Sequence, residues 1–186
     1  SALMLTPFSM NELTEELGIP EFKDADPEFY KSKTPTMTFA NEMKKRIEHI
    51  AKYTKRPIYI SVSTNEAVKN LLKDHLYGEG LLMRYSSKPY DNLAVMRRNF
   101  ENTYLLDYLY EMFYPETLTD VCLDLKGVKM LSIYYVPAFK SLLQFYKESG
   151  DVTHYDKLYS LLESIVKKAD YYSDEVRERY LKSINF

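Results

Sequence analysis

The amino-acid sequence predicts an α+β protein, predominantly α, in which a small two-stranded α/β unit precedes a helical tail. Apolar residues recur every three or four positions through most of the chain, which is the spacing of helices that bury one face. Only 5 of the 186 residues are glycine, which suits long helices. The β-branched and aromatic run at 56–64 is the strongest strand signal. The hydrophobic fraction of 45% is that of a globular protein.

Residues 1–35 are predicted to form an irregular arm, which must lie on another part of the chain to be ordered. A short helix is expected near Ser9–Leu17, because Ser9-x-x-Glu12 matches a capping box, in which the two side chains satisfy free N–H groups at a helix start. One glycine and four prolines interrupt the arm: Gly18, Pro7, Pro20, Pro27 and Pro35.

Residues 36–88 are predicted to form the small α/β unit. Its first helix presents an apolar stripe made of Phe39, Met43, Ile47 and Ile50. The strand at 56–64 follows, with Pro57 at its first position, where a missing N–H is tolerated.

A second helix of this unit is expected to start at the capping box Ser63-x-x-Glu66 and to extend through Leu76. Gly78-Glu79-Gly80 would end it, and Leu81–Tyr85 would form the second strand. Because a helix connects the two strands, we expect them to be parallel neighbours.

Residues 89–186 are predicted to be entirely helical, with a boundary at Ser86–Pro89 and all parts packed as one compact unit. The first helix of this subdomain should run from about Asn92 to Phe113. The second should run from about Lys126 to Ser149 with a kink at Pro137, because proline removes a helical hydrogen bond.

The end of the second helix and the two helices after it follow from local signals. Gly150 should close the second helix, and Asp151 or Thr153 should cap a third. This tight turn makes the two helices antiparallel neighbours, as in a tetratricopeptide-like hairpin. A fourth helix is expected at about Ser173–Ser183.

Composition excludes several classes of function. A net charge of −2 and a pI near 6.0 argue against nucleic-acid binding. The basic stretch between Lys44 and Arg56 is interpreted as a solvated helix face. A single cysteine, Cys122, excludes an internal disulfide. No run of 18 apolar residues and no signal peptide is present.

No catalytic, cofactor or metal site is predicted. The three histidines, His49, His75 and His154, have no partner at ligand spacing. The segment Ser61–Glu66 lies between a strand and a helix start, where free N–H groups can bind an anion. A small independent enzyme could use this helix start as its site. Without a glycine-rich phosphate motif, helix capping is the favoured interpretation.

Five residues are candidates for binding. Tyrosines gather around the first two helices of the tail, and tyrosine can stack on sugars or hold peptides, although core packing is more common at helix spacing. Arg84 stands in the second strand. We expect Met83 and Tyr85 to face the core, and Arg84 to pair with Glu79, Glu101 or Asp107 on the other face. The candidates are Arg84, Tyr104, Tyr108, Tyr134 and Tyr135.

Two motifs resemble a known family. Arg56-Pro57-Ile58-Tyr59 and Glu79-Gly80-Leu81 with Arg84-Tyr85 occur in order, followed by the helical hairpin at Gly150. Over about 36–168 the chain resembles the C-terminal soluble region of glycosyltransferase family 117, earlier domain-of-unknown-function family 2723, multi-pass membrane proteins of Bacteroidetes-type bacteria. Pro137 departs from the family pattern.

The resemblance implies a role without catalysis in this part of the chain. In the family the catalytic loop belongs to the membrane-embedded half, so no catalytic residue carries over here. The chain would be a periplasmic C-terminal module, cut from a longer protein that would itself be a membrane glycosyltransferase at the inner membrane. It would pack on the transmembrane portion of the same polypeptide or help to bind an acceptor protein or glycan. The alternative is a free-standing helical module that binds peptides or proteins.

Overall fold

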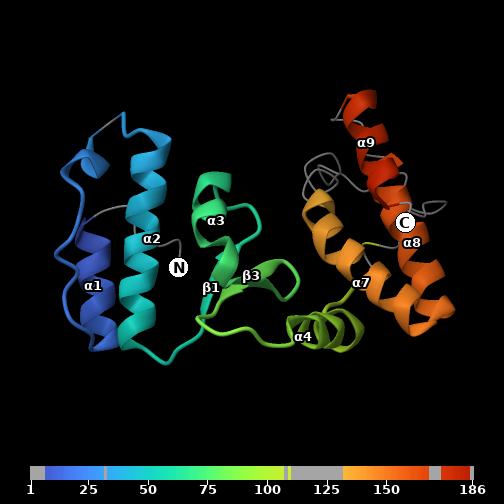
Figure 1. Ribbon diagram of the computed structural model, residues 1–186, viewed down its shortest axis with the longest axis horizontal. Helices are drawn as coiled ribbons and strands as arrows, with labels where there is room; N and C mark the ends of the chain where they lie inside the picture. Colours follow the sequence, from blue (N-terminus) through green and yellow to red (C-terminus); the bar gives the residue numbers. More distant parts are fainter. Residues whose placement is uncertain (1–6, 32, 107–108, 110–131, 168–172, 185–186) are drawn as a thin grey trace, which may run out of the picture. The chain divides into compact units, whose positions relative to one another are not determined.

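The computed structural model describes residues 7–31, 33–106, 109, 132–167 and 173–184. These residues form a mostly helical α+β protein with seven α-helices and one three-stranded antiparallel sheet (Figure 1). The chain divides into two compact units. The first unit comprises 1–77 and 83–89, and the second comprises 78–82 and 90–186.

The N-terminal arm of the first unit lies on a long helix. The arm contains α1 (Pro7–Leu17) and a 3₁₀ turn (Pro27–Tyr30), and the long helix is α2 (Thr36–Tyr53). Met10 and Phe22 of the arm are buried in one cluster with Ile50 of α2. The expected arm helix is therefore confirmed, but it begins at Pro7. Ser9 lies inside it, so the predicted capping box is wrong; proline is well suited to a first helical turn.

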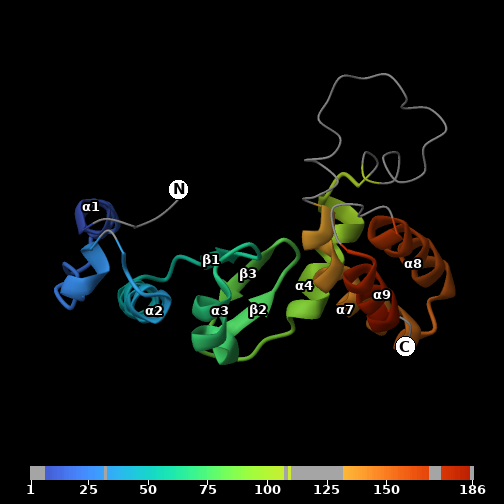
Figure 2. The ribbon, with the colours of Figure 1, turned by 90° about the horizontal axis from the view of Figure 1, so that it is seen from above.

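The first unit also contains the sheet, whose strand order is β1-β3-β2. β1 (Ile58–Ser61) leads to α3 (Glu66–Leu72), β2 (Leu76–Gly78) and β3 (Leu82–Tyr85). Figure 2 shows β1, β3 and β2 with α3 beside them.

The strands predicted at 56–64 and 81–85 are neighbours, as expected, but they are antiparallel and a third strand completes the sheet, so the prediction of a parallel pair is wrong. The helix crossover from β1 leads to β2, and β3 then folds back and inserts between them. Since both outer strands are antiparallel to β3, they run in the same direction without touching. The predicted second helix was also too long, because Leu76 starts β2 and Asn65, not Ser63, caps α3 by accepting a hydrogen bond from the Ala67 N–H at 2.8 Å.

A buried cluster joins the sheet to two helices. Ile47 of α2, Ile60 of β1 and Leu72 of α3 are all buried in it. Met83 and Tyr85 pack against the same cluster, so their predicted direction into the α/β core is confirmed.

The second unit begins with a helix that changes its winding. α4 (Asn92–Arg98) continues as a π-helical turn (Asn99–Thr103), and Tyr104 is extended at φ −80° and ψ 130°. The helix predicted from Asn92 to Phe113 therefore ends ten residues early. Residues 107–108 and 110–131, where the rest of it and the start of the next helix were predicted, lie outside the described residues.

Three more helices complete the second unit: α7 (Val136–Ser149), α8 (Val152–Lys167) and α9 (Asp174–Ile184). Pro137 stands in the first turn of α7, after a 3₁₀ turn at Ile133–Tyr135. Because the start of the predicted helix, 126–131, lies outside the described residues, a kink at Pro137 stays a prediction. Gly150 ends α7 with a left-handed backbone (φ 73°), as predicted. Asp151 then accepts the His154 N–H at 3.2 Å, and α8 packs along α7.

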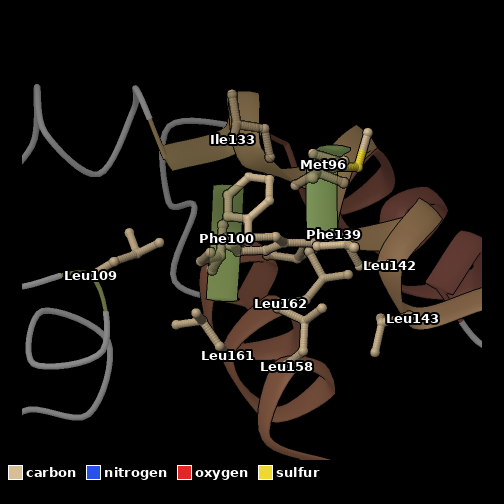
Figure 3. Packing of buried hydrophobic residues seen from close by; sticks show 14 of the residues in the cluster. Met96, Phe100, Leu109, Ile133, Phe139, Leu142, Leu143, Leu158, Leu161 and Leu162 are labelled. Atoms are coloured by element: carbon tan, nitrogen blue, oxygen red, sulfur yellow. The ribbon is translucent and has the colours of Figure 1, made fainter. Parts of the chain in front are cut away.

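The core of the second unit is aromatic in the middle and aliphatic around it (Figure 3). Phe100 from the π-helical turn meets Phe139 of α7 edge-on, with their ring centroids 5.2 Å apart. Leu142 of α7 and Leu161 and Leu162 of α8 surround this pair and are at most 1% exposed.

Eight apolar residues from the predicted helices and strands are all at least partly covered. Ile47, Ile60, Leu142 and Leu162 are buried. Phe39, Ile58, Leu71 and Phe145 are partly buried and pack against the same clusters. Within the described ranges, no helix has the length and apolar character needed to cross a bilayer.

Candidate functional site

Arg84 lies at a hollow on the first unit that we call the basic cleft. The cleft has a volume of about 430 Å³ and lies where the C-terminal end of α2, the link before β1 and the end of β3 meet. Its cationic side chains come from all three segments: Lys52, Lys55, Arg56 and Arg84. The only carboxylate among its lining residues is that of Glu48.

Each part of the cleft is positioned by the local fold. α2 ends at Tyr53, and the Thr54 N–H still donates to the Ile50 carbonyl. The Thr54 hydroxyl accepts the backbone N–H of Arg56 at 3.1 Å, which fixes the turn that carries Lys55 and Arg56. Tyr85 contributes a hydroxyl whose pKa is raised, first by burial and then by the negative charge of Glu48.

The acids proposed as partners of Arg84 make other contacts. The Tyr90 hydroxyl donates to Glu79 at 2.6 Å. Glu101 accepts from Arg97 and from the Tyr146 hydroxyl. Asp107 lies outside the described residues. A pairing of Arg84 with any of these three acids stays a prediction.

The second hollow is on the other unit, and we call it the aromatic cavity. It has a volume of about 250 Å³ and is bounded by the π-helical turn, the segment 104–106, α7 and α8. Phe100, Phe139 and Leu142 line it with apolar surface. Glu101, His154 and Lys157 add charged or polar groups.

Tyr104 is the sequence candidate that lines this cavity. It meets Phe100 edge-on with the ring centroids 4.9 Å apart. Gly80 lies in the turn between β2 and β3, in the part 78–82 that belongs to the same unit as Tyr104. It is so close that a Cβ there would be 2.9 Å from the Tyr104 ring. The ring is therefore fixed in position by packing on two sides.

The other three tyrosines are placed differently. Tyr135 is half-buried against Phe139 at 5.4 Å, and its pKa is raised by burial and further by the neighbouring Tyr104. Tyr134 is 38% exposed and is not part of the cavity lining. Tyr108 lies outside the described residues.

Hydrogen bonds and one ring stack connect the side chains along one wall of the aromatic cavity. The Tyr146 hydroxyl donates to Glu101 at 2.9 Å, and the Glu101 carboxylate lies 3.3 Å from Arg97 Nε. The Tyr146 ring stacks on the ring of His154, and His154 Nδ1 is 2.8 Å from Asp151 Oδ2. Phenol, carboxylate and imidazole thus occupy one continuous surface.

Two pKa values in this wall are displaced. Burial raises the pKa of Tyr146, and the hydrogen bond to Glu101 and that carboxylate's charge raise it further. The pKa of Asp151 is lowered, first by the backbone N–H of His154 and also by its side chain. At neutral pH the Tyr146 phenol is therefore neutral and the Asp151 carboxyl is ionised.

Other sites considered from the sequence gain no support as ligand sites. Among the described residues, no three His, Cys, Asp or Glu side chains are grouped to hold a metal. The Ser63 hydroxyl is 2.8 Å from the Ser61 hydroxyl and belongs to the turn before α3.

No family model, no curated protein and no solved structure matches this chain.

Sequence reasoning did not find either hollow as a whole. Glu101 and Tyr146 are 45 positions apart, so no local pattern joins them. Lys52, Lys55 and Arg56 were included in the basic stretch interpreted as a solvated face. A signal that could have separated Arg56 from the helix face is its position just before a strand, beyond the end of the helix.

Proposed function

We propose that this chain is a non-catalytic binding module, the periplasm-facing C-terminal part of a membrane glycosyltransferase-like protein of the family 117 type. It packs on the transmembrane portion of the same polypeptide or helps to hold an acceptor protein or glycan. The family motifs support this proposal, because Ile58-Tyr59 of the first motif and Arg84-Tyr85 of the second lie on the neighbouring strands β1 and β3. The tight hairpin of α7 and α8 agrees with a tetratricopeptide-like tail.

The aromatic cavity is the observation that supports acceptor binding most directly. Tyr104 presents a fixed ring at the edge of an apolar floor, and rings of this kind stack on the apolar faces of sugars. The Glu101 carboxylate has more acceptor capacity than its contacts with Arg97 and Tyr146 use, so it can accept sugar hydroxyls. Lys157 supplies a donor at the cavity.

The test of glycan binding compares a tyrosine that lines the aromatic cavity with one that does not. Saturation-transfer NMR with mannose, galactose and N-acetylglucosamine oligosaccharides should detect binding to the intact chain. Tyr104→Ala should remove the signal, because it takes away the stacking ring. Tyr134→Ala should keep it, because this exposed ring does not line the cavity. Equal loss in both variants, or no binding of any oligosaccharide, contradicts a glycan-holding role.

A second function is favoured by Leu105, which is 83% exposed at the same cavity. An exposed leucine beside an apolar floor suits a peptide side chain, as in a free-standing helical module that binds peptides. Binding of tyrosine- or leucine-containing peptides that Leu105→Ala weakens, without binding of oligosaccharides, selects this alternative.

The proposal also states that the chain does no chemistry by itself. Incubation with an activated glycoside should give neither transfer nor hydrolysis above the buffer rate. Turnover that disappears in Ser63→Ala or in a histidine variant contradicts the proposal.

A further inference from the structure

We infer that the basic cleft is a binding site for a phosphate monoester carried on a small organic body the size of a sugar. This site is in the first unit and is independent of the aromatic cavity, which lies in the second. It therefore goes beyond the proposed function and can succeed or fail separately from it.

The first step of the argument is convergence. Lys52 lies at the end of α2, Lys55 and Arg56 lie in the link, and Arg84 lies on β3, yet all four line one hollow. A solvated helix face accounts for cations on one helix, and cations near the end of α2 also offset its dipole. Neither effect explains why Arg84, from a strand 28 positions after Arg56, lies in the same cleft.

The second step is charge. Four cations and one carboxylate give the lining a formal charge of +3. Glu48 also has another cation near it, since its carboxylate is 3.8 Å from Lys44. Within the part of the chain that is described, neither the Lys55 ammonium nor the Arg56 guanidinium forms an ion pair. Like charges that line one cleft repel one another, so an anion that binds in the cleft relieves the repulsion.

The third step is the type of anion. A phosphate monoester carries close to two negative charges and three acceptor oxygens, which matches a cleft with several cations better than a carboxylate does. The guanidinium groups of Arg56 and Arg84 can each bind two of those oxygens as a fork. Thr54, Ser87 and Tyr85 place neutral hydroxyl groups around the same hollow.

The fourth step is size. At about 430 Å³ the cleft falls in the range of small-molecule sites and is far larger than a phosphate alone requires. Ala51, Pro57 and Ile58 give one part of it an apolar surface, against which the carbon skeleton of a sugar can lie. The phosphate then occupies the cationic part.

The experiment is titration calorimetry of the full chain with glucose 6-phosphate, with glucose and gluconate as controls. We expect heat of binding with glucose 6-phosphate and much weaker or no binding of the neutral and carboxylate controls. A second arm uses phosphatidylcholine vesicles with and without phosphatidic acid. Binding only to vesicles that contain phosphatidic acid also supports a phosphate monoester site and identifies a lipid as its source. Binding of neither phosphate, or equal binding of gluconate, overturns the inference.

Variants connect the binding to the cleft. Arg56→Gln and Lys55→Gln remove exposed cations, so the fold should stay intact, and each should weaken binding at least about tenfold. Arg56→Lys keeps the charge but loses the fork, so it should lie between Arg56→Gln and the unchanged chain. Lys23→Gln removes a cation that is 79% exposed and outside the cleft, and binding should not change. If Lys23→Gln weakens binding of glucose 6-phosphate as much as Arg56→Gln does, the assignment of the site to the cleft is overturned.

Discussion

Arg46 Nε donates to Glu42 Oε1 at 2.8 Å, one helical turn away on α2, and both side chains are fully buried. Arg46 Nη2 also donates to the Tyr30 hydroxyl at 2.7 Å, and the guanidinium carbon lies 4.6 Å from the centre of the Phe29 ring. The expectation that the basic stretch is a solvated helix face is therefore wrong for Arg46. This arginine instead attaches the N-terminal arm to α2, because Phe29 and Tyr30 belong to the arm.

We predict that Glu42→Ala and Arg46→Ala each lower the free energy of unfolding by about 3–5 kcal/mol, because each leaves a buried charge without its partner. The double variant with methionine at both positions should lose much less free energy of unfolding than the two single variants lose together. Urea unfolding monitored by circular dichroism measures both quantities. A loss of under about 1 kcal/mol in both single variants would mean that the pair is solvated after all.

The Tyr146–Glu101 hydrogen bond predicts that the folded state loses stability at alkaline pH. The raised pKa of Tyr146 means that the folded state keeps its proton while an unfolded tyrosine ionises near pH 10. Stability from this group is complete below about pH 10 and falls as the pH rises above it. Tyr85 and Tyr135, whose pKa values are also raised, act in the same direction.

Tyr146→Phe keeps the ring on His154 but removes the hydroxyl. At neutral pH we expect a loss of about 1.5–3 kcal/mol, the usual value for a hydrogen bond to a charged group. Above pH 10 the stability of this variant should fall less steeply than that of the unchanged chain. Parallel pH profiles measured by urea unfolding would contradict the assigned role of the hydroxyl.

Gly80 and Tyr104 should be energetically coupled. Gly80→Ala puts a Cβ at φ 131°, where side chains are strained, and 2.9 Å from the Tyr104 ring. Gly18→Ala meets the same kind of strain at φ 63° but has open space around it, so it serves as the control. Gly80→Ala should cost more than Gly18→Ala, and part of the excess should disappear in a Tyr104→Ala background. Additive losses in thermal unfolding would show that the two residues do not press on each other.

The core of the second unit predicts a clear contrast between two positions on α8. Leu162→Ala should cost about 2–5 kcal/mol, because the side chain has no exposed surface and leaves a cavity. Val152→Ala should change stability by less than about 0.5 kcal/mol, because Val152 is 65% exposed. Similar losses at both positions, measured in the same denaturant series, would mean that the assignment of the buried face is wrong.

What could be predicted from the sequence is local in origin. The apolar stripe of α2, the glycine that ends α7 and the cap at Asp151 each depend on residues within one or two turns, so their patterns are sufficient. The arrangement of the sheet is not local, because β3 pairs with β1 across α3 and β2. Leu76 satisfies the spacing of a helix equally well as that of a strand, and only the nonlocal pairing decides between them.

The two hollows show the same difference between local and nonlocal information. Arg84 was selected because it stands in a predicted strand, and Tyr104 because it belongs to a group of tyrosines around the first two helices of the tail. Their surroundings were not predicted, since each hollow combines segments that are far apart in the sequence. Arg46 was misassigned because the local sequence does not show that the arm covers it completely, whereas Lys44 and Lys45 beside it keep exposed surface.

The hairpin tip Gly78–Leu82 has a practical consequence for anyone who wishes to divide this protein. The tip is counted with the second unit, where Asn92 donates to the Gly78 carbonyl and Asn99 to the Glu79 carbonyl, both at 2.8 Å. A fragment beginning at Tyr90 loses these acceptors together with the carboxylate that Tyr90 itself contacts. A fragment ending at Pro89 keeps the tip but not the residues that hold it. A single cut between Pro89 and Tyr90 therefore removes contacts from both fragments. Only a fragment that contains Gly78–Leu82 together with residues 90–186 keeps the second unit intact.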